Sequence, residues 1–221
     1  MQANYVQRLR GTFGKGGPSR FISHLYLVRT IERALIRAQI PLAYSQGFNP
    51  QPRMQFAAAL PLGITSECEI VDLFLSESID PEATFQNLKN KMAPGIVMHT
   101  LVEQKLSSPK LQTITSQARY VVSFTDDQPT IEMRKAVDKV LSAKEINRTR
   151  RDKVYDLRPL IIELEIEETQ SDVIQLSITM THLPGLSGRP DEVLKELGLD
   201  PLAARIHRKE LILTEPVSAG H

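Results

Sequence analysis

Residues 5–39, YVQRLRGTFGKGGPSRFISHLYLVRTIERALIRAQ, contain the strand, turn and helix that decide the fold of this chain. In YVQRLRGTF the apolar residues Val6, Leu9 and Phe13 stand among basic residues, a pattern typical of a strand. GKGGPS then predicts a turn. Ser23 is a candidate helix cap, because its hydroxyl can accept a hydrogen bond from a free N–H of the first turn. We therefore predict a helix that begins at Ser23 and runs to the end of this stretch.

The predicted helix has two different faces at ~100° of rotation per residue. Arg29, Arg33 and Arg37 follow one another at a spacing of one turn, with Glu32 as the only acid nearby. Arginine suits the paired binding of phosphate or carboxylate, so this row is a candidate binding face. The alternative is an ordinary solvated helix surface. The opposite face is apolar and is formed by Leu27, Val28, Ile31, Ala34, Leu35 and Ala38.

The segments that follow complete a βαββαβ order in the first half. MQFAAAL (54–60) and CEIVDLFLS (68–76) are predicted strands, and GIVMHTLVEQ (95–104) is a third. Between them, Asp80-Pro81-Glu82 predicts the start of a helix, because proline is favoured at the first helical position. This order is that of the ferredoxin-like unit.

A similar order is predicted again after a linker, LSSPKLQTITSQA (106–118), which is polar and has no clear period. In the helix of 129–143 we expect Ile131, Ala136, Val137, Val140 and Leu141 to face largely inward. The other predicted elements are strands in 118–125, 158–168, 173–183 and 207–215 and a helix in 189–199. The sequence thus predicts an α+β fold of tandem ferredoxin-like halves with mostly antiparallel sheets. The halves are 1–105 and 119–215, and 216–221 is predicted to be a flexible tail.

Charge is divided unevenly along the chain. Residues 1–53 hold eight Lys/Arg and one acid, while the other 168 residues hold 19 basic and 25 acidic side chains. The formal charge of +1 therefore conceals a cationic first quarter and an acidic remainder. A cationic region of this kind favours binding to a polyanion or to an acidic partner surface.

Composition argues against several classes of protein. No apolar run approaches the ~20 residues of a membrane span, and the N-terminus lacks the apolar stretch of a secretory signal, so a cytoplasmic protein is expected. The single cysteine, Cys68, cannot form an internal disulfide or supply the ligands of an iron–sulfur cluster. The five histidines show no i, i+4 spacing and no H-E-x-x-H. We therefore expect no metal and no cofactor.

YSQGFNPQPR (44–53) is the strongest candidate binding segment. Its glycine and prolines predict a rigid turn. Aromatic side chains on such a turn can stack on unpaired bases, amides can bond base edges, and arginine can contact phosphate. The alternative is that Tyr44 and Phe48 are core residues beneath a structural loop. The residues that the turn presents are Tyr44, Gln46, Phe48, Asn49 and Arg53.

His24 is the sharpest candidate for chemistry. It stands in the first turn of the predicted helix, close to Arg20. A helix N-terminus favours an anion, and a histidine there can donate to a phosphate or act as a base. The alternative is that His24 only caps and packs the first turn.

Residues 20–72 resemble the radical-SAM-linked protein family, an uncharacterised domain family found beside radical SAM enzymes or fused to them. The motifs that carry the resemblance are Arg-Phe-x-Ser-His-Leu, Glu-Arg-Ala-Leu, Tyr-Ser-Gln-Gly-Phe-Asn-Pro and Leu-Pro-Leu-Gly, in this order. This chain departs from the family pattern at Tyr26, where an acid is usual, and at Gln51, where a histidine is usual. The resemblance implies a radical SAM partner enzyme and, because some members lie near genes for ribosomal proteins and RNA processing, RNA or a ribosomal component as a further partner.

Three functions follow from these features. The first is a non-catalytic binding module that presents RNA or a ribonucleoprotein substrate to a radical SAM partner. The second is a metal-independent endoribonuclease with His24 as general base and Arg20 or Arg29 stabilising the phosphorane. The third is a docking subunit whose basic face binds the partner enzyme without RNA. The sequence favours the first, so we expect an accessory protein rather than an enzyme.

Overall fold

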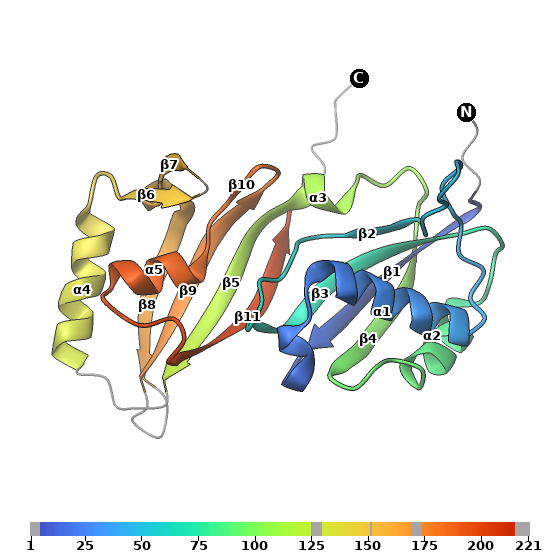
Figure 1. Ribbon diagram of the computed structural model, residues 1–221, viewed down its shortest axis with the longest axis horizontal. Coiled ribbons are helices and arrows are strands. Elements are labelled where there is room, and N and C mark those ends of the chain that lie inside the picture. Colours follow the sequence, from blue (N-terminus) through green and yellow to red (C-terminus); the bar gives the residue numbers. More distant parts are fainter. Residues whose placement is uncertain (1–4, 125–129, 151, 169–173, 215–221) are drawn as a thin grey trace. The chain divides into compact units, whose positions relative to one another are not determined.

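The computed structural model describes residues 5–124, 130–150, 152–168 and 174–214. It divides the chain into two compact units (Figure 1). Unit 1 comprises Met1–Thr115 and Thr214–His221, and unit 2 comprises Ser116–Leu213. The predicted flexible tail, 216–221, lies outside the described residues. Among the described helices, none is long and apolar enough to cross a membrane.

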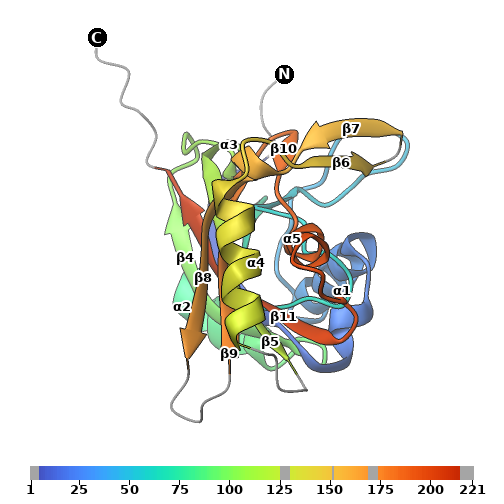
Figure 2. The ribbon, with the colours of Figure 1, turned by 90° about the vertical axis from the view of Figure 1, so that its left-hand side faces the viewer.

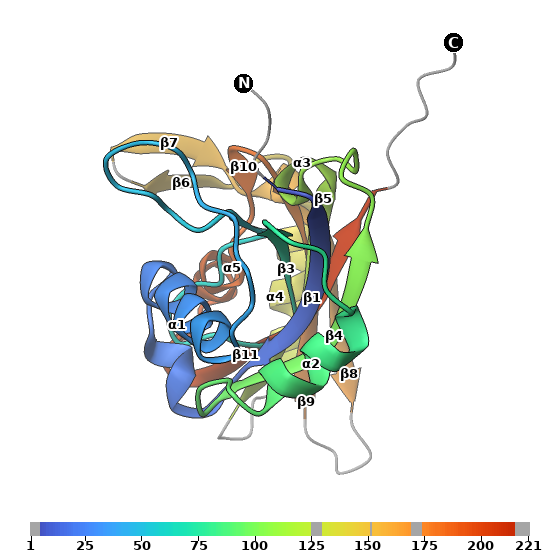
Figure 3. The ribbon, with the colours of Figure 1, turned by 90° about the vertical axis from the view of Figure 1, so that its right-hand side faces the viewer.

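Unit 1 is an antiparallel sheet with helices. Strand β1 pairs with β3 on one side and with β4 on the other (Figure 3). Strand β2 pairs with β3. The strand order is therefore β4-β1-β3-β2, and all of these pairings are antiparallel. Its elements are β1 (Gln7–Lys15), η1 (Gly17–Phe21), α1 (His24–Arg37), β2 (Met54–Phe56), β3 (Thr65–Leu75), α2 (Pro81–Lys89), β4 (Ile96–Gln104) and α3 (Leu111–Ile114).

Both predicted helix starts of unit 1 are confirmed. The Ser23 hydroxyl accepts a hydrogen bond of 3.3 Å from the Tyr26 N–H, so Ser23 is the N-cap of α1. The Asp80 carboxylate accepts a bond of 2.8 Å from the Ala83 N–H, and Pro81 is the first residue of α2. Each cap satisfies a backbone donor that has no partner within its helix.

The core of unit 1 lies on one face of its sheet. Residues alternate between the faces along a strand, so Leu9 and Phe13 of β1 share a face with Val71 and Leu73 of β3. The other face carries Arg8, Arg10 and Asp72. The helical residues of the core are Leu27, Ile31, Ala34 and Leu35 of α1 and Leu88 of α2, as the apolar face of α1 predicts.

Unit 2 also combines helices with an antiparallel sheet. Strand β9 lies between β5 and β8, β10 pairs with the end of β9, and β11 neighbours β5. Helices α4 and α5 lie on the same side of these strands (Figure 2). The elements are β5 (Thr115–Phe124), α4 (Thr130–Ser142), β6 (Asn147–Arg150), β7 (Lys153–Asp156), η2 (Arg158–Leu160), β8 (Ile161–Glu168), β9 (Ile174–Leu183), β10 (Leu186–Ser187), α5 (Pro190–Glu196) and β11 (Ala204–Leu213).

The chain as a whole therefore has a mixed α+β fold in which the sheet is mostly antiparallel, as predicted. The segment predicted as a linker, 106–118, contains α3 and the first residues of β5. Leu111 in this segment is fully buried, and its carbonyl accepts a hydrogen bond of 2.8 Å from the hydroxyl of the buried Thr115. Burial of Leu111 and the hydrogen bonds from Arg8 to the Ser108 and Pro109 carbonyls hold the segment, and neither contact is visible in the periodicity of the sequence.

Candidate nucleic-acid interface

The arginine row of α1 is exposed along its length. Arg29, Arg33 and Arg37 all lie on the solvent side of the helix, opposite its buried face. Arg37 donates a hydrogen bond of 2.6 Å to the Lys91 carbonyl. Within the described part of the chain, the side chains of Arg29 and Arg33 form no hydrogen bond or ion pair. Two guanidinium groups one turn apart are thus available to an anionic ligand.

The loop between α1 and β2 is closed by its own hydrogen bonds. The Ser45 N–H donates to the Gln51 carbonyl at 2.8 Å, and the Gln51 N–H donates to the Ser45 hydroxyl at 2.9 Å. Tyr44 and Pro52 form an antiparallel bridge just outside this pair. The enclosed residues Gln46, Phe48 and Asn49 are exposed, and the relative exposure of Phe48 is 107%. The closed loop thus holds an aromatic ring in solvent.

Tyr44 and Phe48 have different environments. Tyr44 is half-buried and packs against the core of unit 1. Burial raises the pKa of its hydroxyl, and the negative charge of Glu32 raises it further. Tyr44 therefore lies at the edge of the core, whereas Phe48 is outside it.

His24 is the first residue of α1 and is partly enclosed. Its ring lies edge-to-face against the Phe56 ring, with 5.2 Å between centroids. Burial lowers the pKa of His24, Glu69 raises it and Lys15 lowers it, so the ring is largely neutral near pH 7. Its Nδ1 is buried and forms no hydrogen bond within the described residues. The cap of α1 is made by Ser23, so His24 packs the first turn without capping it.

The glycine-bearing turn before α1 is held by main-chain contacts. The Gly16 N–H donates to the Gly95 carbonyl at 2.8 Å, and the Ser19 hydroxyl donates to the Pro94 carbonyl at 2.7 Å. Gly95 has a φ of +82°, and a Cβ there would lie 2.5 Å from the Gly16 oxygen. The neighbouring Arg20 guanidinium lies over the Phe21 ring, 4.6 Å from its centroid. These contacts fix the turn, and no described contact joins Arg20 to His24.

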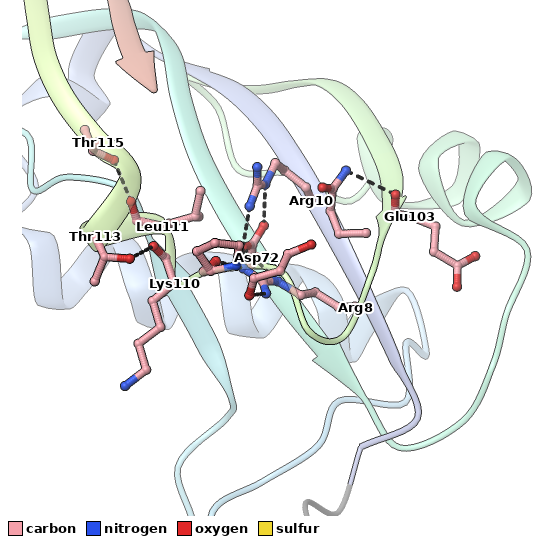
Figure 4. A network of polar contacts seen from close by, with 11 residues as sticks. Arg8, Arg10, Asp72, Glu103, Lys110, Leu111, Thr113 and Thr115 are labelled. Carbon is pink, nitrogen blue, oxygen red and sulfur yellow. Dashed lines mark hydrogen bonds and ion pairs between the residues drawn. The ribbon is translucent and has the colours of Figure 1, made fainter. Parts of the chain in front are cut away.

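A buried charge network occupies the other face of the unit 1 sheet (Figure 4). Arg8 Nε donates to Asp72 Oδ2 at 3.0 Å, and Arg10 Nε donates to Asp72 Oδ1 at 2.8 Å. The remaining Arg8 donors reach the carbonyls of Ser108 and Pro109, at 2.5 and 2.7 Å. Arg8 and Asp72 are 2% and 0% exposed, respectively. Two of the basic residues of the first quarter are therefore structural, which their charge alone did not reveal.

Beside this network lies a cavity of about 180 Å³ in unit 1. The Tyr5 and Phe74 rings meet edge-to-face at 4.8 Å, and the Arg53 guanidinium lies 5.6 Å from the centre of the Tyr5 ring. Arg53 Nε and Gln55 Oε1 are buried and form no hydrogen bond within the described residues. Arg53 is thus separated from the exposed loop residues with which it was predicted to act. The cavity is lined by Tyr5, Arg53, Met54, Gln55 and Phe74.

Sequence reasoning missed most of this cavity. Gln55 is opposite Asp72 in the β2–β3 pairing, and the Phe74 N–H donates to the Arg53 carbonyl at 3.0 Å. The positions of Gln55 beside Asp72 and of Arg53 beside Phe74 both depend on the register between β2 and β3, which no local sequence pattern specifies. The one available signal was the position of Arg53 immediately before a predicted strand.

Unit 2 carries a separate buried polar group. Arg208 is 0% exposed, and its Nε and Nη2 donate to the Tyr120 hydroxyl at 3.3 and 3.2 Å. Burial, together with the positive charge of Arg208, lowers the pKa of His182 to about 4. His182 is therefore neutral near pH 7.

The solved structures that match this chain share little of its sequence. The matches include a Cbf5–Nop10–Gar1 complex (TM-score 0.48, 9% identity, 91% of this chain and 48% of that chain). They also include an archaeal box H/ACA sRNP Nop10–Cbf5 complex (TM-score 0.43, 11% identity, 93% and 49%) and an H/ACA RNP bound to a substrate RNA containing 2'-deoxyuridine (TM-score 0.42, 10% identity, 91% and 47%). This chain thus spans about half the length of the chains it matches.

No curated protein matches the sequence. A family model, in contrast, matches residues 8–188, which include the arginine row, the exposed loop and the cavity residues from Arg53 to Phe74. The chain belongs to the family described as "Uncharacterized protein conserved in bacteria (DUF2344)".

Proposed function

We propose that this protein is a non-catalytic RNA-binding module that presents RNA, or a ribonucleoprotein substrate, to a radical SAM partner enzyme in the cytoplasm. The observation that carries the proposal is the exposed Phe48 ring on its closed loop. This ring belongs to the same basic quarter of the chain as the exposed Arg29 and Arg33.

A fully exposed phenylalanine on a closed loop suits base stacking. Its ring is presented at little entropic cost, because the Ser45–Gln51 hydrogen bonds already order the loop. Stacking on an aromatic ring tolerates any base, whereas guanidinium groups contact phosphate whatever the sequence. Together they support binding to single-stranded RNA with little sequence preference.

The partner enzyme in this proposal comes from the resemblance of residues 20–72 to radical-SAM-linked proteins. A module that presents a substrate needs no reactive group of its own. In the alternative of a ribonuclease, His24 is neutral and so able to accept a proton, but its Nδ1 is enclosed and its ring packs on Phe56. The enclosure favours the module.

We also infer that each unit is a ferredoxin-like βαββαβ unit. In unit 1 the strand order β4-β1-β3-β2 supports this, with α1 and α2 as the two crossing helices. In unit 2 the corresponding elements are β5, α4, β8, β9, α5 and β11, with the sheet order β11-β5-β9-β8. The β6–β7 hairpin and β10 are additions to that pattern.

The proposal is tested by the salt dependence of RNA binding. Replacing Arg29, Arg33 and Arg37 together by Gln removes up to three phosphate contacts, each worth about 0.7 in the slope of log K against log salt for a single strand. We expect weaker binding to all sequences and a slope lower by about two. The matched control replaces the exposed Lys135, Lys139 and Lys144 by Gln, which changes the net charge equally and should leave the slope unchanged.

Three outcomes would overturn the proposal. Absence of RNA binding by the unmodified protein at low salt would remove its basis. Binding to a radical SAM enzyme without RNA binding would make the basic quarter a docking surface. Cleavage of RNA by the unmodified protein that disappears in His24→Ala would make the protein a nuclease.

A further inference from the structure

We propose that the cavity of unit 1 lined by Tyr5, Arg53, Met54, Gln55 and Phe74 binds one unpaired pyrimidine base of the RNA. This inference rests on the proposed function and deepens it by assigning a base-specific site. The site is separate from Phe48, which has its ring in solvent.

Two residues that line the cavity each carry a buried polar atom without a partner among the described residues. Arg53 Nε and Gln55 Oε1 are both buried without a hydrogen-bond partner in the described residues. Next to them on the same sheet face, Asp72 accepts from both Arg8 and Arg10, and Arg8 directs its other donors to two carbonyls. The polar groups around Asp72 are thus paired, whereas Arg53 Nε, a donor, and Gln55 Oε1, an acceptor, are left unpaired. Such pairs of unsatisfied groups are costly in a native protein, and a ligand that satisfies them accounts for their retention.

The cavity is large enough for a single ring. It measures about 180 Å³, and a protein cavity of about 150 Å³ is known to hold benzene. A pyrimidine is a single ring of this size, whereas a purine has two fused rings. The aromatic walls are Tyr5 and Phe74, which meet at 61°, and Met54 adds an adaptable apolar side chain.

The chemistry of the lining also suits a pyrimidine. Uracil and cytosine each present a ring carbonyl, which can accept from Arg53, and an N–H, which can donate to the Gln55 amide oxygen. The terminal torsion of a glutamine is soft, so the Gln55 amide can turn toward a bound ring at little cost. The Arg53 guanidinium already lies over the Tyr5 ring, an arrangement that keeps its plane close to the apolar wall.

Gln55→Leu separates a binding role from a structural one. Leucine approximates the size of glutamine but has no amide, so it removes an unsatisfied buried group. We expect the Tm of Gln55→Leu to equal or exceed that of the unmodified protein. A structural amide would instead lower the Tm when replaced. Gln51→Leu is the matched control, because Gln51 is an exposed glutamine on the adjacent loop.

The experiment measures binding of hexauridylate, hexaadenylate and an abasic hexamer with the same phosphates to the full chain. We expect the unmodified protein to bind hexauridylate at least about tenfold more tightly than the abasic hexamer, and more tightly than hexaadenylate. Gln55→Leu should lose about tenfold in affinity for hexauridylate and nothing for the abasic hexamer. Gln51→Leu should change neither affinity.

The outcomes distinguish this inference from the proposed function. Equal binding of hexauridylate and the abasic hexamer overturns the base site and also the stacking on Phe48, and leaves only the phosphate contacts of the proposed function. Equal binding of hexauridylate and hexaadenylate overturns the choice of a pyrimidine. If no hexamer binds, the proposed function fails, and free uridine followed by ligand-observed NMR then decides the cavity. Uridine binding that Gln55→Leu abolishes supports the site, and no uridine binding overturns it.

Discussion

Asp72 is the residue on which the buried charge of Arg8 depends. Its carboxylate is fully buried and receives hydrogen bonds from two arginines, of which Arg8 is only 2% exposed. Bringing these charges out of water is costly, and the pairing with further hydrogen bonds offsets that cost. Because Arg8 also bonds Ser108 and Pro109, one carboxylate orients the guanidinium that holds the segment before α3.

Replacing Asp72 tests this dependence. Asp72→Asn leaves the Arg8 guanidinium buried with a neutral partner, and we expect the free energy of unfolding to fall by about 3–5 kcal/mol. Urea denaturation measures the change. The control is Glu103→Gln on β4, an exposed carboxylate, whose replacement should stay within about 0.5 kcal/mol. A loss of similar size in both variants would contradict a special role for Asp72.

His182 should make unit 2 sensitive to mild acid. Its pKa is about 4 in the folded protein, whereas an unperturbed histidine has a pKa of 6.5, so the unfolded chain binds more protons between these values. The stability that the neutral ring provides is complete above pH 6.5 and is lost as the pH falls toward 4. Because each tenfold change in proton affinity corresponds to about 1.4 kcal/mol, the total loss is a few kcal/mol at most.

Thermal unfolding between pH 7 and pH 5 checks this prediction. Carboxylates also begin to titrate in this range, so the informative quantity is the difference between the unmodified protein and His182→Gln. We expect Tm to fall more steeply with acidification in the unmodified protein. Parallel curves would show that His182 has the same pKa in the folded and unfolded chain.

At the scale of the element, sequence periodicity correctly predicted the two faces of α1. Its predicted apolar face is the buried face, and the arginine row is exposed, because one long helix with a 3.6-residue period fixes both faces at once.

Ile31 is 0% exposed, so Ile31→Asn should destabilise unit 1 by a few kcal/mol by burying an amide without a partner. Arg33→Ala should stay within about 0.5 kcal/mol of the unmodified protein in the same denaturation assay. Loss of the fold in Arg33→Ala would make the row structural.

The prediction for α4 was correct in part. Val137 and Val140 are buried as expected, but Ile131 is 66% exposed and Leu141 is 36% exposed. Met133 is buried instead, so the buried residues follow one another at positions 133, 137 and 140. Both choices of face contain apolar residues at helical spacing, and only the packing partner decides between them.

The loop that carries Phe48 gives a second prediction at this scale. Phe48→Ala should cost about 1–3 kcal/mol in RNA binding and leave the salt slope unchanged, because stacking releases no counterions. The free energy of unfolding should not change, since the ring contributes nothing to the core. RNA titrations at several salt concentrations make the measurement. An altered slope would place Phe48 among the phosphate contacts.

For the whole molecule, the sequence predicted those features that depend on residues close together in the chain. Helix caps, the faces of α1 and the alternation of strands and helices all depend on residues a few positions apart. The cavity, by contrast, joins Tyr5, three residues that begin at Arg53, and Phe74. Its geometry depends on strand register and on which face of the sheet each side chain occupies. The β6–β7 hairpin was also missed, because its strands of four residues are too short to show a period.

The close contact at Gly95 limits which residues can replace it during evolution. Any side chain at this position would meet the Gly16 oxygen and would also require a backbone conformation that only glycine adopts readily. Substitutions at Gly95 are therefore unfavourable for two separate reasons, the contact with the main chain and the backbone conformation. Descendants of this sequence can vary at Arg33 or Asn49 and still fold, but those that keep the turn must keep this glycine.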